Sequence, residues 1–114
     1  LHSEDGYDEI SLTGPFSYIS NKGAGTLGPR EILQTEPLKA EDLNGGKTVK
    51  EAADIFMNVL QGKGTEAQHK VVIANSAIGL RTVYPDKKLE DCITEAENSL
   101  YGQKALDSFR KLVG

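Results

Sequence analysis

The stretch GGKTVKEAADIFMNVLQG, residues 45–62, divides this chain of 114 residues into a turn-rich part and a helical part. Thr48 and Glu51 form a capping box, in which the threonine hydroxyl accepts from the backbone N–H of Glu51 and the carboxylate reaches back. The apolar residues behind this cap recur at helical spacing and predict an amphipathic helix that ends at Gly62. They are Val49, Ala52, Ala53, Phe56, Val59 and Leu60.

The chain after Gly62 continues with the same signals. Thr65 repeats the capping signature and opens a second helix, which we expect to run to about Thr82 before Pro85 closes it. A third helix is predicted to start near Lys88, and the phase of its apolar stripe resets at Gly102 into a fourth. Residues 47–114 are therefore predicted to form three or four packed helices.

Residues 1–46 contain only short β signals between turn residues. Phe16 to Ile19 predicts a strand, the turn-rich residues 21–25 predict a loose hairpin, and Thr26 to Leu33 predicts a second strand. Pro29 would weaken that second strand or confine it to an edge. A short helical turn is expected at residues 40–43, and we treat 1–114 as a single partial domain with 1–46 and 47–114 as its two regions.

Composition excludes several classes of protein. The net charge is −4, and the isoelectric point is near 5.1, which argues against a partner such as nucleic acid or an anionic membrane. No apolar run approaches the roughly 18 residues of a membrane span. The single cysteine, Cys92, cannot form an internal disulfide and suits a reducing compartment, so we expect a cytoplasmic protein.

The strongest chemical signal is an acidic cluster near the start of the chain. Glu4, Asp5, Asp8 and Glu9 follow one another closely, and no lysine or arginine occurs among the first 21 residues. Such close carboxylates repel one another unless they bind a cation or splay into water. Mg²⁺ prefers hard oxygen ligands and usually bridges one or two carboxylates to substrate phosphates. Gly6 would let both pairs face a common point, although for a generic acidic cluster a solvated loop is the favoured interpretation.

Other candidates are weaker. Residues 23–25, Gly-Ala-Gly, lack the strand and helix of a nucleotide-binding loop and are interpreted as a turn. The pair at 45–46 precedes a capped helix and could receive an anion, but a hinge is the favoured interpretation. Cys92 lies on an apolar stripe and is predicted to be a core residue. His69 lies among polar neighbours and is predicted to be exposed, and Asn75 needs a partner if it is buried.

The order of residues 2–15 resembles a known family. The run His2-Ser3-Glu4-Asp5-Gly6-Tyr7-Asp8-Glu9-Ile10-Ser11, followed by Thr13-Gly14-Pro15, is similar to the acidic motif of anthranilate phosphoribosyltransferases. The resemblance continues through Gly45-Gly46, the Val-Leu-Gln-Gly segment at 59–62, the apolar-Asn-Ser-Ala helix at 71–77 and Gly-Gln-Lys-Ala-Leu at 102–106. These landmarks span nearly the whole chain in the family's order.

The resemblance implies a fold and a function. The fold would be α/β: part of the C-terminal domain of the nucleoside phosphorylase and phosphoribosyltransferase group, with a β-hairpin region followed by the helices. The family transfers the phosphoribosyl group of phosphoribosyl pyrophosphate to anthranilate, in tryptophan biosynthesis. Asp8 and Glu9 would bind Mg²⁺ near the pyrophosphate, Asp5 and Gly6 would shape the loop, and no catalytic residue is assigned.

The resemblance also implies what the chain lacks. The family's glycine-rich phosphate loop and anthranilate-binding helices are absent from this sequence, so we expect a C-terminal piece that is inactive alone, from a parent that forms a homodimer. Two alternatives stay open. One is a pyrimidine-nucleoside phosphorylase or a non-catalytic relative of the same fold, and the other is a stand-alone interaction module with a solvated acidic loop.

Overall fold

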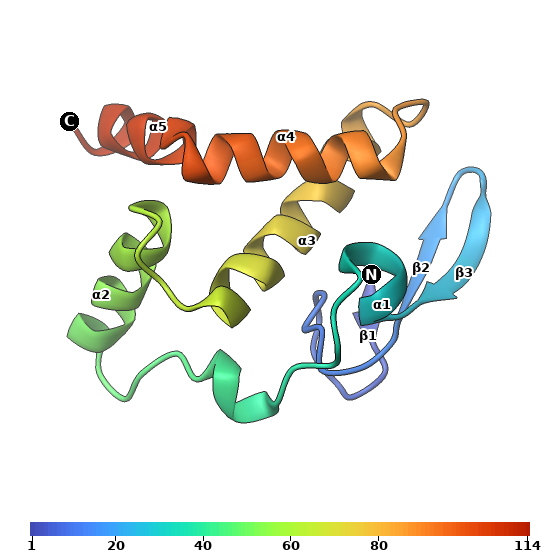
Figure 1. The fold of residues 1–114 in the computed structure, drawn as a ribbon, viewed down its shortest axis with the longest axis horizontal. Coiled ribbons are helices and arrows are strands. Elements are labelled where there is room, and N and C mark those ends of the chain that lie inside the picture. Colours follow the sequence, from blue (N-terminus) through green and yellow to red (C-terminus); the bar gives the residue numbers. More distant parts are fainter. The chain divides into compact units, whose positions relative to one another are not determined.

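The computed structural model describes residues 1–114, which divide into two compact units, 1–43 and 44–114 (Figure 1). The first unit holds a small sheet and short helical segments, and the second is entirely helical. The fold is therefore a three-stranded antiparallel sheet followed by helices. None of the helices combines the length and the apolar character that crossing a membrane requires.

The sheet of the first unit has the order β1-β2-β3 and is antiparallel throughout. Strand β2 (Phe16–Ser20) pairs with β3 (Gly23–Leu27), so that Tyr18 faces Gly25. A Cβ atom at Gly25 would lie 2.7 Å from the Tyr18 hydroxyl, so glycine makes room for the aromatic ring. The two-residue strand β1 (His2–Ser3) pairs with the start of β2 and was not predicted.

The second strand, predicted from Thr26 to Leu33, is wrong beyond Leu27. Strand β3 ends at Leu27, and Pro29–Leu33 form the short helix α1. Pro29 occupies the first helical turn, where its missing N–H is no loss, and the Glu31 carboxylate accepts from the Gly28 N–H at 3.0 Å. The proline therefore starts a helix instead of marking an edge strand. The helical turn expected at 40–43 is present as the 3₁₀ helix η1 (Ala40–Leu43).

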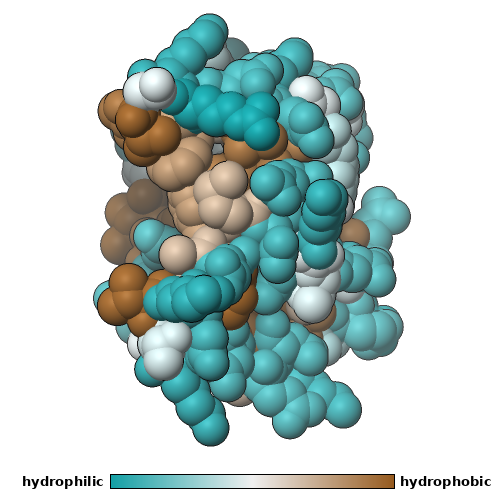
Figure 2. Space-filling model, turned by 90° about the vertical axis from the view of Figure 1, so that its left-hand side faces the viewer, coloured by the Kyte–Doolittle hydropathy of each residue, from teal (hydrophilic) through white to brown (hydrophobic).

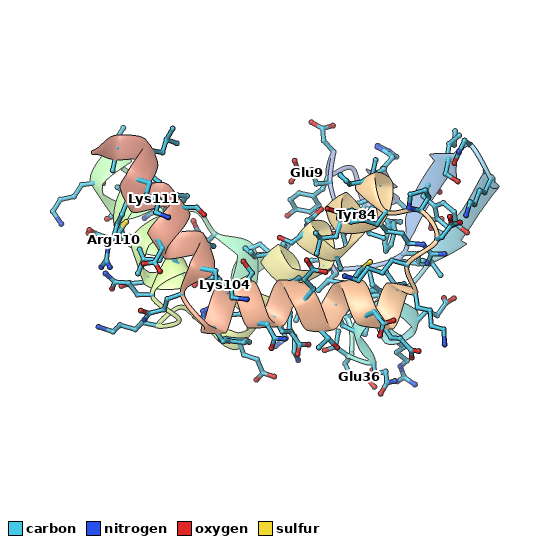
Figure 3. All side chains as sticks on the ribbon, turned by 90° about the horizontal axis from the view of Figure 1, so that it is seen from above. Glu9, Glu36, Tyr84, Lys104, Arg110 and Lys111 are labelled. Atoms are coloured by element: carbon cyan, nitrogen blue, oxygen red, sulfur yellow. The ribbon has the colours of Figure 1, made fainter.

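The helices of the second unit confirm the pattern of caps. Helix α2 (Val49–Leu60) begins after Thr48, whose side chain accepts from the Glu51 N–H at 3.1 Å. Helix α3 (Glu66–Val83) begins after Thr65, which exchanges two hydrogen bonds with Gln68. Helices α4 (Leu89–Tyr101) and α5 (Lys104–Val113) follow one another with a bend between them (Figure 3), and α3 packs against α4 (Figure 1).

Most buried side chains of this unit lie on the apolar faces of α3 and α4, and one comes from α5. Cys92 is fully buried, as its place on the apolar stripe predicts, and so is Leu106. The others are Val59, His69, Ile73, Ala74, Ala77, Ala96 and Leu100. Several of them are alanines, which lets helices approach closely.

Helix α2 buries little of its apolar stripe. Val59 is its only buried residue, whereas Val49 is 89% exposed and Phe56 is 48% exposed. Phe56 makes an edge-to-face contact with Phe109 of α5, with ring centroids 5.0 Å apart. Figure 2 shows apolar side chains gathered on the side of the molecule where α2 and α5 lie.

Candidate acidic-loop site

The acidic cluster lies in a closed loop that joins β1 to β2. The Gly6 N–H donates to the Ser3 carbonyl at 3.0 Å, and the Ser3 N–H donates to the Tyr7 carbonyl at 3.0 Å. Gly6 has a φ of +100°, in the region that L side chains rarely adopt, and no other atom would block a Cβ there. Glycine is thus required by the backbone conformation of the turn, not by lack of space.

The hydroxyls of Ser3 and Ser11 form hydrogen bonds between the start and the end of this loop. Ser3 is fully buried, and its Oγ donates to the carbonyl of Glu9 at 2.5 Å. The Ser11 N–H donates to the same Ser3 Oγ at 3.2 Å, and the Ser11 hydroxyl lies 3.3 Å from it. One serine side chain therefore ties the start of the loop to its end.

Asp5 belongs to the same hydrogen-bond network. Its carboxylate accepts from the Ser11 hydroxyl at 3.4 Å and from the Thr13 hydroxyl. Between these two residues Leu12 is fully buried and has a φ of +61°, which is uncommon for a residue other than glycine. The turn at Leu12 allows both neighbouring hydroxyls to reach the Asp5 carboxylate while the leucine side chain enters the core.

Asp8 and Glu9 differ from Asp5 in their hydrogen bonding, because neither carboxylate takes part in a hydrogen bond or ion pair. All three residues are exposed, and Glu9 lies at the surface of its unit (Figure 3). The structure does not gather three or more acidic, histidine or cysteine side chains at one point. The expectation that all four carboxylates face a common point is therefore wrong, because Asp5 is turned toward Ser11 and Thr13.

The donor set of the exposed pair still fits Mg²⁺. Two neighbouring carboxylates supply hard oxygen ligands, and Mg²⁺ in proteins commonly takes one or two carboxylates and completes its shell with water and phosphate oxygens. Asp8 and Glu9 would hold such an ion without a third protein ligand. His2 and Glu4 are also exposed.

The glycine pairs that were weaker candidates have structural roles. The interpretation of residues 23–25 as a turn is wrong, because they lie within β3, where Gly25 accommodates Tyr18, and the turn is confined to residues 21–22. Gly46 precedes α2 with a φ of +83°, and the Glu51 carboxylate accepts from the Lys47 N–H at 2.6 Å. That carboxylate occupies the helix start with negative charge, which disfavours an anion there.

The prediction for His69 is wrong. The ring is only 6% exposed, makes an edge contact with Tyr101 at 5.4 Å between centroids, and leaves its Nε2 buried without a hydrogen-bond partner. The overlooked signal was spacing, since His69 precedes Ile73 and Ala77 by one and two turns on the same buried face.

Asn75 is half-buried, and its side-chain amide donates a hydrogen bond to the Val71 carbonyl at 2.9 Å.

Electrostatic pairs lie outside the acidic loop. Hydrogen bonds and Coulomb attraction to a carboxylate raise the pKa of Arg30, beside Glu36, and of Lys50, beside Asp54. The hydrogen bond from Lys87 to Glu95 likewise raises the lysine's pKa. The Arg30 and Lys50 pairs are largely solvated, and the Lys87 pair is partly so. Other cations such as Lys104, Arg110 and Lys111 lie along α5 (Figure 3).

A shallow apolar groove of about 420 Å³ runs along α3 and α4 in the second unit. Val72, Gly79 and Val83 line it from α3, and Ala96 and Ser99 line it from α4. Its polar groups are few, and Glu95 at its margin is paired with Lys87. The groove therefore offers apolar contact but no reactive side chain.

Comparison with curated proteins identifies the relatives of this chain. It is 46% identical over 114 residues to the anthranilate phosphoribosyltransferase of Cytophaga hutchinsonii, covering 99% of this chain and 34% of that protein. The corresponding enzymes of Flavobacterium johnsoniae and Bacteroides fragilis are 44% and 42% identical, with 98% and 99% of this chain and 33% and 34% of theirs covered. The chain is homologous to part of anthranilate phosphoribosyltransferase.

The homology extends across both units. The chain spans about a third of the length of the anthranilate phosphoribosyltransferases that it matches. No family profile matches it, and no solved structure matches it. The resemblance of the acidic loop and the helical landmarks to anthranilate phosphoribosyltransferase is thus confirmed at the level of homology.

Proposed function

We propose that this chain forms the C-terminal portion of an anthranilate phosphoribosyltransferase. The complete protein would transfer the phosphoribosyl group of phosphoribosyl pyrophosphate to the amine of anthranilate, in the cytoplasm and as a homodimer. The observation that carries the proposal is 40–46% identity across essentially the whole chain to proteins of that name. The acidic loop at residues 2–15 adds a chemically suitable site.

Asp8 and Glu9 are the residues proposed to act in the reaction. Their exposed, unpaired carboxylates would hold Mg²⁺ beside the pyrophosphate. When bound, this ion would offset the negative charge that grows on the leaving pyrophosphate. The carboxylates hold and orient, and neither needs to remove a proton from the substrate amine.

The chain by itself is proposed to be inactive. It covers about a third of its relatives, and its acidic loop offers carboxylates but no cluster of cationic side chains for the phosphate oxygens. Arg30, Lys50 and Lys87 are already engaged with carboxylates. Phosphate-binding groups would have to come from the remaining two thirds of the protein.

A chimera tests this proposal. The homologous third of the Cytophaga hutchinsonii enzyme is replaced by this chain, and consumption of anthranilate with phosphoribosyl pyrophosphate is followed by fluorescence at several Mg²⁺ concentrations. We expect Mg²⁺-dependent turnover by the chimera and none by the chain alone. In the chimera, Asp8→Asn and Glu9→Gln should each lower the rate about 10-fold or more at limiting Mg²⁺.

The controls separate a folding defect from a lost role. Ser20→Ala, on the exposed hairpin, should leave the rate of the chimera unchanged. A chimera that folds, by circular dichroism, but never turns over would contradict the proposed activity. Equal rates for wild type and both acidic variants at limiting Mg²⁺ would remove the role of Asp8 and Glu9 alone.

A further inference from the structure

Ser3 contacts the backbone on both sides of Asp8. Its N–H donates to the carbonyl of Tyr7 at 3.0 Å, and its Oγ donates to the carbonyl of Glu9 at 2.5 Å. Asp8 is therefore held between two carbonyl groups that are bound by a single residue. Ser3 in turn is fixed by its pairing with Phe16 in the sheet, so the loop is anchored to β2.

The Ser3 hydroxyl makes two hydrogen bonds that join the start of the loop to its end. Its proton goes to the Glu9 carbonyl at 2.5 Å, and its oxygen accepts from the Ser11 N–H at 3.2 Å. The Ser11 hydroxyl lies 3.3 Å away, and its one proton can serve either Ser3 or Asp5 but not both at once. Because Ser3 and Ser11 are both buried, removal of the Ser3 hydroxyl would leave the Ser11 N–H without its partner.

Asp5 completes the arrangement from the other side of Ser11. Its carboxylate accepts from the hydroxyls of Ser11 and Thr13, whereas the carboxylates of Asp8 and Glu9 are exposed and make no hydrogen bond. Asp5 is therefore engaged with the protein, and the carboxylates of Asp8 and Glu9 are free to bind a cation.

We infer that Ser3, supported by Ser11 and Asp5, is a positioning residue that fixes the backbone of Asp8 and Glu9 so that both carboxylates reach one Mg²⁺ ion. This inference rests on the proposed function for the metal, but the hydrogen bonds that fix the loop do not depend on it. Ser3 itself would not touch the ion or the substrate. Groups that orient metal ligands typically change metal affinity about 10- to 100-fold when removed.

The first measurement needs no metal. Amide hydrogen exchange is compared between the wild-type chain and Ser3→Ala, with Ser20→Ala as the matched control because its hydroxyl bonds only within the exposed hairpin. We expect the Ser11 amide to exchange about fivefold faster in Ser3→Ala, as the loss of one hydrogen bond predicts, and to be unchanged in Ser20→Ala. Equal exchange in Ser3→Ala and wild type would overturn the inference.

The second measurement uses Mn²⁺ as a probe for the Mg²⁺ site, with free Mn²⁺ followed by electron paramagnetic resonance. Ser3→Ala should bind Mn²⁺ about 10-fold more weakly than wild type, at a temperature where circular dichroism shows both to be folded. Ile32→Val, which thins the buried core of the same unit, should lower the melting temperature and leave Mn²⁺ affinity unchanged. Unchanged affinity in Ser3→Ala, or an equal loss in Ile32→Val, would overturn the positioning role.

The two measurements distinguish this inference from the proposed function. If the wild-type chain and the chimera bind no Mn²⁺, the proposed metal role of Asp8 and Glu9 fails, and with it the purpose of the positioning. If wild type binds Mn²⁺ and Ser3→Ala binds it equally well, the metal role stands and the positioning role is rejected. Should Ser3→Ala fail to fold, Ser11→Ala replaces it, because it removes a hydroxyl partner of both Ser3 and Asp5 and keeps the Ser11 N–H.

Discussion

Gly64, in the turn between α2 and α3, is predicted to tolerate no side chain. A Cβ at this position would lie 2.9 Å from Gln68 Oε1, 2.9 Å from Val59 Cγ2 and 3.1 Å from His69 Nε2. Val59 and His69 are buried, and Gln68 Oε1 accepts from the Thr65 N–H at 2.9 Å in the capping box. None of these atoms can withdraw without disturbing either the core or the helix start.

The size of the effect follows from two opposing contributions. Overpacking a well-packed site costs about 1–3 kcal/mol, and replacing glycine by alanine restricts the unfolded chain, which returns about 0.4–1 kcal/mol. Gly64→Ala should therefore lower the free energy of unfolding by about 1–2 kcal/mol. The measurement is a urea titration followed by far-ultraviolet circular dichroism.

Replacement of Gly79 by alanine is a matched control, because it should change the free energy of unfolding in the opposite direction. Gly79 lies within α3, and a Cβ there would meet no atom within 4 Å. Alanine is a better helix former than glycine by about 0.8–1 kcal/mol, so Gly79→Ala should raise the free energy of unfolding by that amount. A Gly64→Ala variant as stable as wild type, or two variants with the same sign, would refute the packing described around Gly64.

Three further predictions follow from the helical unit. Thr65→Ala should lower the free energy of unfolding by about 1 kcal/mol in a urea titration, because the α3 cap is lost; no change would mean that the cap contributes nothing. Cys92 should react with a thiol reagent only as fast as the chain opens, so that labelling accelerates in step with urea unfolding; rapid labelling of the native chain would show that α4 is not packed as described. The hydrogen bond to Asp54 raises the pKa of Lys50 in the folded chain above its ordinary value of 10.5. The pair therefore stabilises the fold fully below pH 10.5, and this stabilisation is lost as the pH rises through the higher pKa of the folded chain. The difference in stability between wild type and Lys50→Met should accordingly be small, constant near neutral pH and smaller in strong base; a difference that grows above the ordinary lysine pKa would contradict this sign.

Local signals predicted the helical unit well. Thr48 and Thr65 each cap a helix through bonds to residues three positions away, so the information for the helix start lies in four consecutive residues. The breaks at Gly62 and Gly102 are equally local. By contrast, β1 is two residues long and exists through its pairing with β2, which is more than ten residues further along. No short pattern within residues 2–3 could have predicted it.

Two errors in the prediction had clear physical causes. At residues 28–33 the apolar pair Ile32 and Leu33 suggests a strand, but Pro29 and the bond from the Gly28 N–H to Glu31 favour a helix start. The polar neighbours of His69 in sequence predict an exposed ring, but its position one turn before Ile73 places it on the buried face. In both cases the deciding contact lay three or four residues away.

The candidate site was predictable in place but not in detail. The order of residues 2–15 located the acidic loop, and the resemblance implied roles for Asp8 and Glu9. The hydrogen bonds of Asp5 depend on the hydroxyls of Ser11 and Thr13 and on the positive φ of Leu12. Composition does not show which carboxylate of an acidic cluster accepts hydrogen bonds from serine and threonine.

The exposed stripe of α2 has a practical consequence for work with this chain. Val49 and Phe56 present apolar surface at the start and middle of a helix that is held mainly at its end, near Val59. Such surface promotes association as concentration rises. Val49 is 89% exposed and lies in the first turn, where a negative charge suits the helix dipole, so Val49→Glu should improve solubility and yield without disturbing the core.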